Sequence, residues 1–253
     1  MSKDIRPLLE GWEYVPGHIS ARWIRGDDGR PLIQLRLDMG AMQMFPEGRP
    51  DGKRPYGHAS LLDYYLRMEE QLPSEDCSLD LNMEACMALQ QEAVQFYYRY
   101  IAYSAIGYLD GVIADTEHDL NLFDLVARNA QDDEIVWEFY QFFPYVRMMN
   151  ARACSEKAVQ ENQYDEAIQI VEDAIFDVRD FLGEFYESDE DDIEACEELL
   201  MLQDMLEQLQ RRRPKTREER LRENLDRAIA VENYERAAVL RDELKKLHPM
   251  TEE

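Results

Sequence analysis

The sequence TREERLRENLDRAIAVENYERAAVLRDELKKL, residues 216–247, predicts two short helices joined by a tight turn. Thr216 and Glu219 have the spacing of a capping box, in which each side chain bonds the other residue's backbone N–H. The amphipathic stripe of a first helix follows, made of Leu221, Leu225, Ala228 and Ile229. Asn233 suits the N-cap of a second helix, and Pro249 stops that helix. The product is a helical hairpin whose alanines let the two helices approach closely.

The second helix and its turn resemble the UVR domain, also called the UvrB/UvrC motif. The resemblance rests on the run from Asn233 to Asp242, which reads Tyr-Glu-x-Ala-Ala-x-Leu-Arg-Asp after the asparagine, and Leu244 and Leu247 continue it. Ala228-Ile229 in the first helix departs from the family's more common Met-plus-alanine pattern. A generic terminal hairpin would also be rich in alanine, leucine and charges, but it does not explain this ordered run. The resemblance covers about an eighth of the chain.

The resemblance implies a hairpin that binds proteins and carries no chemistry of its own. UVR hairpins occur in the helicase and nuclease subunits of bacterial nucleotide excision repair, in Clp-type chaperone ATPases and in a zinc-bearing regulator of a protein arginine kinase. The expected partner is another UVR hairpin, a Clp-type chaperone, an excision-repair subunit or a second copy of the chain. The residues expected at the protein interface are Leu225, Ile229, Tyr234, Ala237, Ala238, Arg241, Asp242 and Leu244.

The charge of the chain is strongly negative and unevenly distributed. The 253 residues carry a formal net charge of −26, and residues 59–210 hold 36 acidic but only 7 basic side chains. DNA-binding proteins gain affinity by neutralising phosphates, so this balance argues against direct binding of nucleic acid. The acidity is typical of a solvated helical surface, or of a surface that recognises a basic partner.

Cysteine usage and hydropathy predict a cytoplasmic protein with reduced thiols. Cys77, Cys86, Cys154 and Cys196 are scattered, without the close spacing of a zinc site. Residues 1–12 lack the apolar stretch of a signal peptide, and no apolar run is long enough to span a bilayer.

Residues 11–46 predict a small antiparallel β-meander. Two strand-like segments flank a Gly-Asp-Asp-Gly turn signal at 26–29, and the second alternates apolar residues with polar Gln34 and Arg36. Such a sheet is weak alone and must cover a hydrophobic face with something larger. The Pro- and Gly-rich residues 46–58 predict an ordered loop or linker without regular structure.

From residue 59 onward the pattern is helical. The first helix is capped by Ser60 and closed by Pro73. Further helices are expected over 82–108, 117–130, 164–186 and 193–213, with a charged break at 187–192. Residues 134–160 are expected to form another helix or a pair of helices, bent at Pro144. The chain therefore divides into a β-meander with its loop (1–58), an acidic helical body (59–213) and the C-terminal hairpin (214–253).

The turn of the C-terminal hairpin has a counterpart inside the acidic body. The segments that begin at Ala158 and at Ala228 both place Glu-Asn shortly before Tyr, an acidic residue and a nearby Ala. Residues 145–182 also resemble a tetratricopeptide (TPR) repeat, and residues 82–130 have a similar outline. A TPR-like array would stack such hairpins into a binding surface. Short turns between antiparallel helices can also converge on similar residues, so both interpretations stay open.

The sequence lacks the constellations that carry catalysis or bind a cofactor. It has no glycine-rich phosphate loop, no GxSxG and no HExxH. Asp115 and His118 could offer two metal ligands from one helical turn, but a carboxylate di-iron bundle needs a second such pair. His118 is therefore interpreted as a polar residue at a helix start. Nothing in the chain resembles the nuclease or helicase domains of excision repair.

Two features suggest nucleic-acid binding at first sight. An aromatic cluster could stack bases, but only Arg99 beside it is basic, so core and groove lining is favoured. The members of this cluster are Phe96, Tyr97, Tyr98, Tyr100, Tyr103 and Tyr108. The basic run 211–215 could contact phosphate, but basic residues followed by a proline also suit a helix C-terminus.

Together these observations predict a mainly α protein with a small N-terminal antiparallel β-meander, a TPR-like body of helical hairpins and a C-terminal UVR hairpin. We expect a non-catalytic adaptor or regulator that acts through protein–protein interaction, without cofactor or metal. The alternative is an accessory protein of nucleic-acid repair that associates with excision-repair subunits. A helical metalloenzyme is a third hypothesis.

Overall fold

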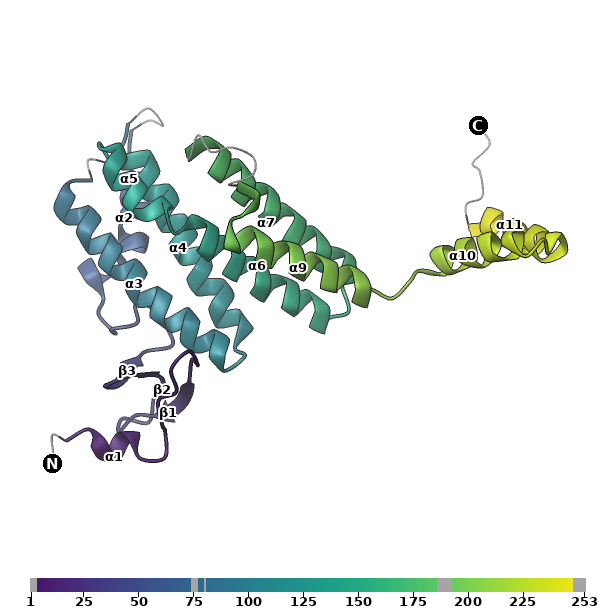
Figure 1. Cartoon of the computed structure of the whole chain (residues 1–253). Coiled ribbons are helices and arrows are strands. Elements are labelled where there is room, and N and C mark those ends of the chain that lie inside the picture. Colours follow the sequence, from purple (N-terminus) through teal and green to yellow (C-terminus); the bar gives the residue numbers. More distant parts are fainter. Residues whose placement is uncertain (1–3, 74–76, 80, 186–192, 248–253) are drawn as a thin grey trace. The chain divides into compact units, whose positions relative to one another are not determined.

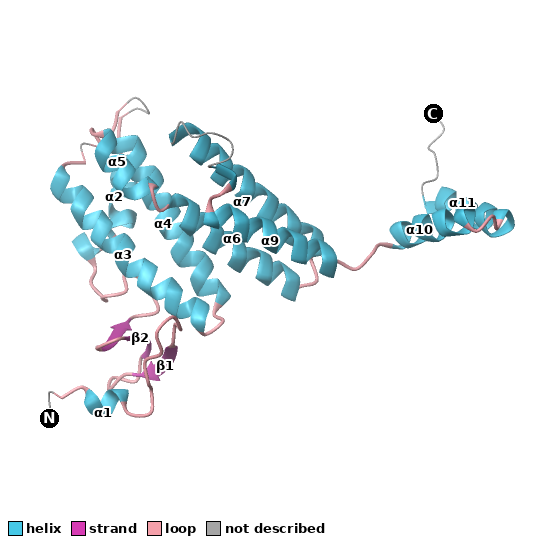
Figure 2. Ribbon diagram, in the orientation of Figure 1, coloured by secondary structure: helices cyan, strands magenta, loops and turns pink. Residues whose placement is uncertain are grey.

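The computed structural model describes residues 4–73, 77–79, 81–185 and 193–247 (Figure 1). The chain forms two compact units, residues 1–208 and 209–253. Helices make up most of the described chain, and its strands lie in the N-terminal part (Figure 2). The expected fold class, mainly α with a small N-terminal sheet and a C-terminal helical pair, is confirmed.

The N-terminal sheet is the expected antiparallel meander, with strands in the order β1-β2-β3. Strand β1 (Ala21–Arg25) pairs with β2 (Pro31–Leu37), and β2 pairs with β3 (Gly40–Met44). The Gly-Asp-Asp-Gly signal forms the first turn, where the N–H of Gly26 donates to the carbonyl of Arg30 at 2.8 Å. A short helix, α1 (Arg6–Leu9), precedes the sheet and is not predicted by the sequence.

The central strand departs from the expected alternation of a buried and a polar face. Residues 32–35 are all buried, so both faces of β2 are covered. Gln34 is only 1% exposed, and its amide is satisfied inside the sheet. Its Oε1 accepts from Arg22 Nε and its Nε2 donates to Gln43 Oε1, each at 3.0 Å. Because a hydrogen-bonded amide tolerates burial, a polar residue in the pattern does not mark a solvent-facing side here.

The helices from α2 to α9, which we call the helical body, follow the sheet. They are α2 (Leu61–Glu69), α3 (Met83–Ala105), α4 (Leu109–Asn129), α5 (Asp133–Tyr140), α6 (Phe143–Gln160), α7 (Tyr164–Phe185) and α9 (Glu197–Arg212). The expected cap at Ser60 is present, since its Oγ accepts from the N–H of Asp63 at 2.9 Å. The charged break predicted at 187–192 lies outside the described residues.

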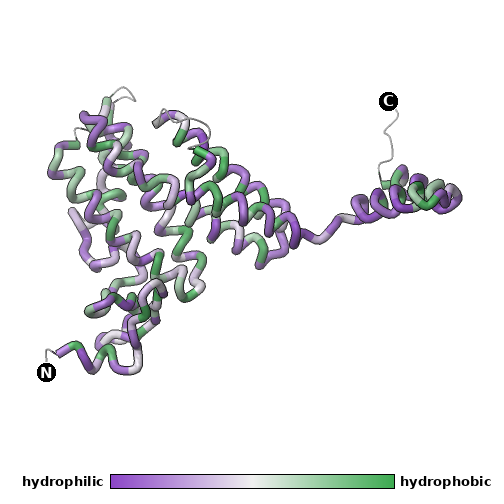
Figure 3. Tube along the Cα trace, in the orientation of Figure 1, coloured by the Kyte–Doolittle hydropathy of each residue, from purple (hydrophilic) through white to green (hydrophobic). Residues whose placement is uncertain are grey.

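The long helices of the body pack in sequence: α3 along α4, α4 along α6, and α6 along α7 (Figure 1). Hydrophobic and hydrophilic residues alternate along these helices, as expected for helices with one buried face (Figure 3). The α3/α4 and α6/α7 pairs are helical hairpins, which a TPR array would also contain. The TPR-like assignment itself stays a prediction.

Helix α4 begins at Leu109, well before the start near residue 117 that the sequence suggested. Gly111 resembles a helix breaker, but it lies in the first turn of α4. A Cβ at this position would come within 2.6 Å of the Tyr103 side chain and 2.5 Å of the Tyr108 side chain. A glycine is therefore required by close packing. His118, expected at a helix start, lies in the middle of α4 and is almost buried.

A buried polar layer on α3 and α4 connects the helical body with the N-terminal segments. Glu92 accepts hydrogen bonds from the backbone N–H groups of Leu61 and Leu62 at 2.8 and 3.0 Å, and so places a carboxylate at the positive end of α2.

Arg99 holds the loop after β3. Its Nη1 donates to two carbonyl oxygens of that loop, those of Phe45 at 2.8 Å and Gly48 at 2.7 Å. The Pro- and Gly-rich loop is thus ordered, as predicted, and contains one 3₁₀ turn, η1 (Pro55–Gly57).

Candidate protein-interaction site

The C-terminal hairpin consists of α10 (Arg217–Ala230) and α11 (Tyr234–Leu247), which pack along each other. The predicted capping box is present. The N–H of Glu219 donates to Thr216 Oγ1 at 3.1 Å, and the N–H of Thr216 donates to Glu219 Oε2 at 2.7 Å. Asn233 caps α11, because its Oδ1 accepts from the N–H of Arg236 at 3.1 Å. Both helix starts are therefore determined by local sequence.

The inner face of the hairpin contains the residues that hold its two helices together. Its buried members are Leu221, Ala228, Ala237 and Leu240, with Leu225 and Leu244 packed against them and half-buried. Three of the predicted interface residues, Leu225, Ala237 and Leu244, thus lie mainly inside the hairpin. Ala228 and Ala237 allow the close approach of the helices that the sequence predicted.

The outer face carries the other predicted interface residues. Tyr234 is 68% exposed, and Ile229 and Ala238 are exposed beside the turn. On α11, Tyr234, Ala238 and Arg241 follow at four- and three-residue spacing, so they share one helical face. Two exposed valines near them, Val231 and Val239, are not among the predicted residues. In the sequence, these two valines stand out only as apolar residues that lie outside the amphipathic stripe.

Several charged residues of the hairpin form ion pairs with residues nearby in the sequence. Arg241 Nε lies 3.9 Å from Asp242 Oδ1 on the exposed surface, a geometry that adds little stability. In the basic run before α10, Arg213 pairs with Glu219 and Lys215 pairs with Glu223. The N–H of Thr216 and the Arg213 guanidinium keep the pKa of Glu219 below its usual value. These two basic side chains thus contact carboxylates of α10.

Three hairpins of this chain use the same turn. The second residue after the end of the first helix adopts a left-handed conformation in each case, at Gly107 (φ 71°), Asn162 (φ 62°) and Glu232 (φ 56°). The next N–H then donates to a carbonyl five residues back: Tyr108 to Tyr103 at 3.0 Å, Gln163 to Ala158 at 2.8 Å, and Asn233 to Ala228 at 2.8 Å. This is the hydrogen-bond pattern of a Schellman turn. The similarity noted between the segments from Ala158 and Ala228 therefore has a shared turn geometry behind it.

The turn leads to a first prediction, on Glu232. A left-handed conformation costs an L-residue about 1–2 kcal/mol, whereas glycine adopts it freely and loses about 0.5–1 kcal/mol through chain entropy. Glu232→Gly should therefore stabilise the hairpin by about 1 kcal/mol or less, and Glu232→Val should destabilise it. Native-state hydrogen exchange of the α10 and α11 amides in the full chain measures both changes. Asn162→Gly should gain less, because asparagine tolerates this conformation better; lower protection in Glu232→Gly would contradict the geometry.

Asp115 and His118, considered above as metal ligands, have different partners. Asp115 forms a two-point ion pair with Arg99, at 2.6 and 2.8 Å. His118 stacks on Phe96 with ring centroids 3.5 Å apart, and its Nδ1 lies 3.1 Å from Asp119 Oδ1. Among the described residues, no group of three or more His, Cys, Asp or Glu side chains is placed to hold a metal ion.

The aromatic cluster of α3 is divided between core and surface. Phe96, Tyr100 and Tyr103 are buried, and Tyr103 donates from its hydroxyl to the carbonyl of Pro46 at 3.0 Å. Tyr97 remains partly exposed at the mouth of a cavity between helices of the body. The cluster thus lines both core and a cavity, the arrangement that the sequence favoured.

Comparison with known protein families finds a match at the C-terminal hairpin. Residues 218–248 match the UvrB/uvrC motif (UVR), a protein-interaction module, and this confirms the resemblance seen at the C-terminal hairpin. No curated protein and no solved structure matches the chain. Among the helices of the described residues, none has the length and apolar character needed to cross a membrane.

Proposed function

We propose that this chain is a non-catalytic adaptor or regulator of the bacterial cytoplasm, which recruits a protein partner through its C-terminal hairpin. One observation carries the proposal: the hairpin that matches the UVR motif forms its own small core with one set of residues and leaves Tyr234, Ile229 and Ala238 exposed. Exposed aromatic and aliphatic side chains beside small residues suit a helix-to-helix interface. We expect the partner to be another UVR hairpin, a Clp-type chaperone, an excision-repair subunit or a second copy of the chain.

The second prediction tests this function by truncation. A chain that ends at Lys215 lacks the hairpin but retains the unit of residues 1–208. We expect both the truncated and the full chain to unfold cooperatively on heating. In an affinity pull-down, we expect the full chain to retain a protein partner that the truncated chain does not retain. Light scattering on the two purified chains shows whether the lost partner is a second copy. Retention of the same partner by the truncated chain would show that the hairpin is not the binding element.

A second candidate function is that of an accessory protein for nucleic-acid repair. The motif itself favours it, because the matching model is named for UvrB and UvrC and the resemblance implies an occurrence in excision-repair subunits. The charge of the chain disfavours direct contact with nucleic acid, so such a role would act through the protein subunits. A salt-sensitive shift of DNA or RNA by the purified chain would instead indicate direct binding.

A further inference from the structure

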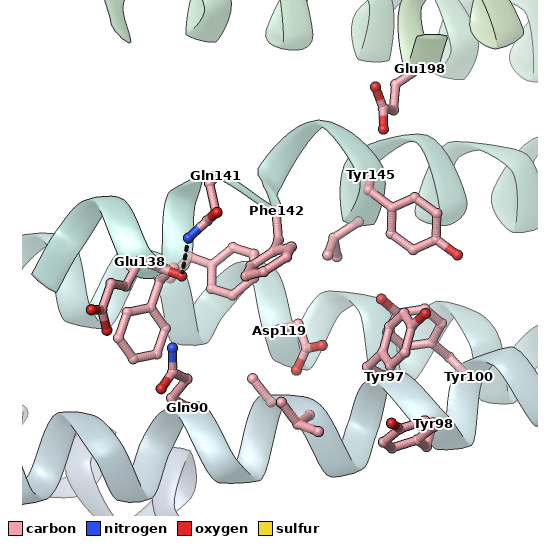
Figure 4. A pocket seen from close by; sticks show the side chains of 15 residues that line it. Gln90, Tyr97, Tyr98, Tyr100, Asp119, Glu138, Gln141, Phe142, Tyr145 and Glu198 are labelled. Carbon is pink, nitrogen blue, oxygen red and sulfur yellow. Dashed lines mark hydrogen bonds between the residues drawn. The ribbon is translucent and has the colours of Figure 1, made fainter.

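A cavity of about 560 Å³ opens between helices of the body, far in sequence from the hairpin. It lies between α3, α4, α5 and α6, and Glu198 of α9 also lines it (Figure 4). Aromatic side chains form much of its wall, among them Tyr97 and Tyr100 of α3, Tyr145 of α6 and Phe142 beside it. Its size is that of a typical ligand pocket, which buries an occupant against aromatic walls and a few polar groups.

The floor of the cavity carries a buried carboxylate, that of Asp119 on α4. Asp119 is 2% exposed, and Figure 4 shows its carboxylate between Phe142 and the tyrosines of α3. Its Oδ1 lies 3.1 Å from Nδ1 of His118, which leaves Oδ2 as the carboxylate oxygen outside this contact. A carboxylate can accept several hydrogen bonds, so Oδ2, on a residue that lines the cavity, is suited to a donor from an occupant.

The charge around the cavity favours a positively charged occupant. Glu138 and Glu198 lie on its rim, and its described lining residues include neither lysine nor arginine. Burial raises the pKa of Asp119 to about 7, and the pair with His118 only partly offsets this. Neighbouring Asp115 and Glu92 raise the pKa of Asp119 further. A cation in the cavity would therefore stabilise the charged form of Asp119.

The mouth of the cavity is apolar and exposed. Phe142 is 53% exposed, and Val94 and Tyr97 are exposed beside it. A small free cation would fill only the space around Asp119 and leave these side chains in water. A side chain presented by a longer segment would bring flanking residues onto them and bury their apolar area.

We propose that this cavity binds an arginine side chain presented by an apolar segment of a partner protein. The planar guanidinium stacks on tyrosine and phenylalanine rings and donates to Asp119 Oδ2, while the residues that flank the arginine pack on Val94, Tyr97 and Phe142. Arginine fits better than lysine, because its guanidinium is more weakly hydrated and stacks on aromatic faces. This site is separate from the hairpin, so it does not depend on the function proposed above.

Matched peptides test the proposal on the full chain at pH 8. The probes are the capped pentapeptide LARAL, its variant with neutral citrulline in place of arginine, and LAKAL. We expect saturable binding of LARAL by titration calorimetry, weakened about tenfold or more by citrulline, since citrulline keeps the shape and removes the charge. LAKAL should bind more weakly than LARAL. Equal binding of the citrulline peptide, or no saturable binding at millimolar concentrations, would overturn the proposal.

Protein variants locate the binding. Asp119→Asn removes the charge on the floor and should weaken LARAL binding about tenfold. Phe142→Ser changes an exposed side chain, so it should weaken LARAL binding without loss of the fold. This variant therefore still tests the site if Asp119→Asn does not fold stably. Phe176→Ser, at another exposed phenylalanine, on α7 and outside the cavity lining, is the matched control and should bind normally. Ala238→Glu in the hairpin should also bind LARAL normally; normal binding by Phe142→Ser would contradict the proposed site.

Discussion

Replacing Asp115 by alanine should lower the free energy of unfolding of the unit of residues 1–208 by about 3–5 kcal/mol. The carboxylate receives two bonds from Arg99, and both side chains are buried. Without Asp115, the guanidinium keeps its two bonds to loop carbonyl oxygens but remains buried without a counter-charge. Urea denaturation followed by circular dichroism measures the loss. It is best measured at pH 8, because burial raises the pKa of Asp115 more than the guanidinium lowers it.

The exposed pair of Lys157 with Asp110 provides a matched control for this prediction. It joins two helices of the same body through a single 2.5 Å contact, but both side chains are exposed to water. Asp110→Ala should therefore cost about 1 kcal/mol or less. Similar losses in the free energy of unfolding for Asp115→Ala and Asp110→Ala would show that burial does not increase the contribution of the Arg99–Asp115 pair to stability.

The loop after β3 gives the Asp115 prediction a second, local readout. Arg99 connects Asp115 with the carbonyl oxygens of Phe45 and Gly48. Without Asp115 the guanidinium is less well fixed in position, so its two bonds to the loop should break more often. Hydrogen exchange in residues 45–52 should then increase before global unfolding. The N–H of Phe45, which donates to the carbonyl of Pro50 at 2.9 Å, reports on this opening.

Local signals in the sequence predict helix ends well in this chain. Ser60, Asn82, Thr216 and Asn233 each accept a backbone N–H at the start of a helix. A capping side chain bonds a backbone N–H only two or three residues away, so a cap can be recognised in the sequence without knowledge of the fold. The meander was predictable for the same reason, because its first turn is set by adjacent glycine and aspartate residues.

Features that depend on distant residues were not predictable. Gly111 resembles a helix breaker until the side chains of Tyr103 and Tyr108 are placed against it. Gln34 resembles a surface residue until Arg22 and Gln43 of the neighbouring strands satisfy its amide. In both cases tertiary packing overrides a local preference.

The candidate hairpin site shows the same division. The run from Tyr234 to Asp242 identified the module, but it did not distinguish the two alanines, of which Ala237 is buried and Ala238 is exposed. That distinction depends on how α10 lies along α11. The cavity lined by Asp119 was even harder to predict from the sequence, because its lining residues come from helices that are far apart in the sequence.

Ala238→Glu should abolish binding of the protein partner while the hairpin itself stays folded. Ala238 is exposed and shares a face with Tyr234 and Arg241, so a glutamate there remains in water in the unbound chain. In a complex where helices approach closely at this position, the same carboxylate would be buried without a partner, which costs about 3–5 kcal/mol. A loss of that size corresponds to a reduction in affinity of more than a hundredfold.

Two further variants separate loss of the interface from loss of the fold. Arg236→Ala changes the net charge by the same amount as Ala238→Glu but lies on a different face of α11, so it should bind the partner normally. Ala237→Glu places the charge between α10 and α11, where Ala237 is buried, and should disrupt the hairpin itself. Circular dichroism should thus show full helix content for Ala238→Glu and reduced content for Ala237→Glu. Wild-type affinity in Ala238→Glu would place the interface elsewhere, since a glutamate cannot be accommodated at a closely packed helix contact without a partner.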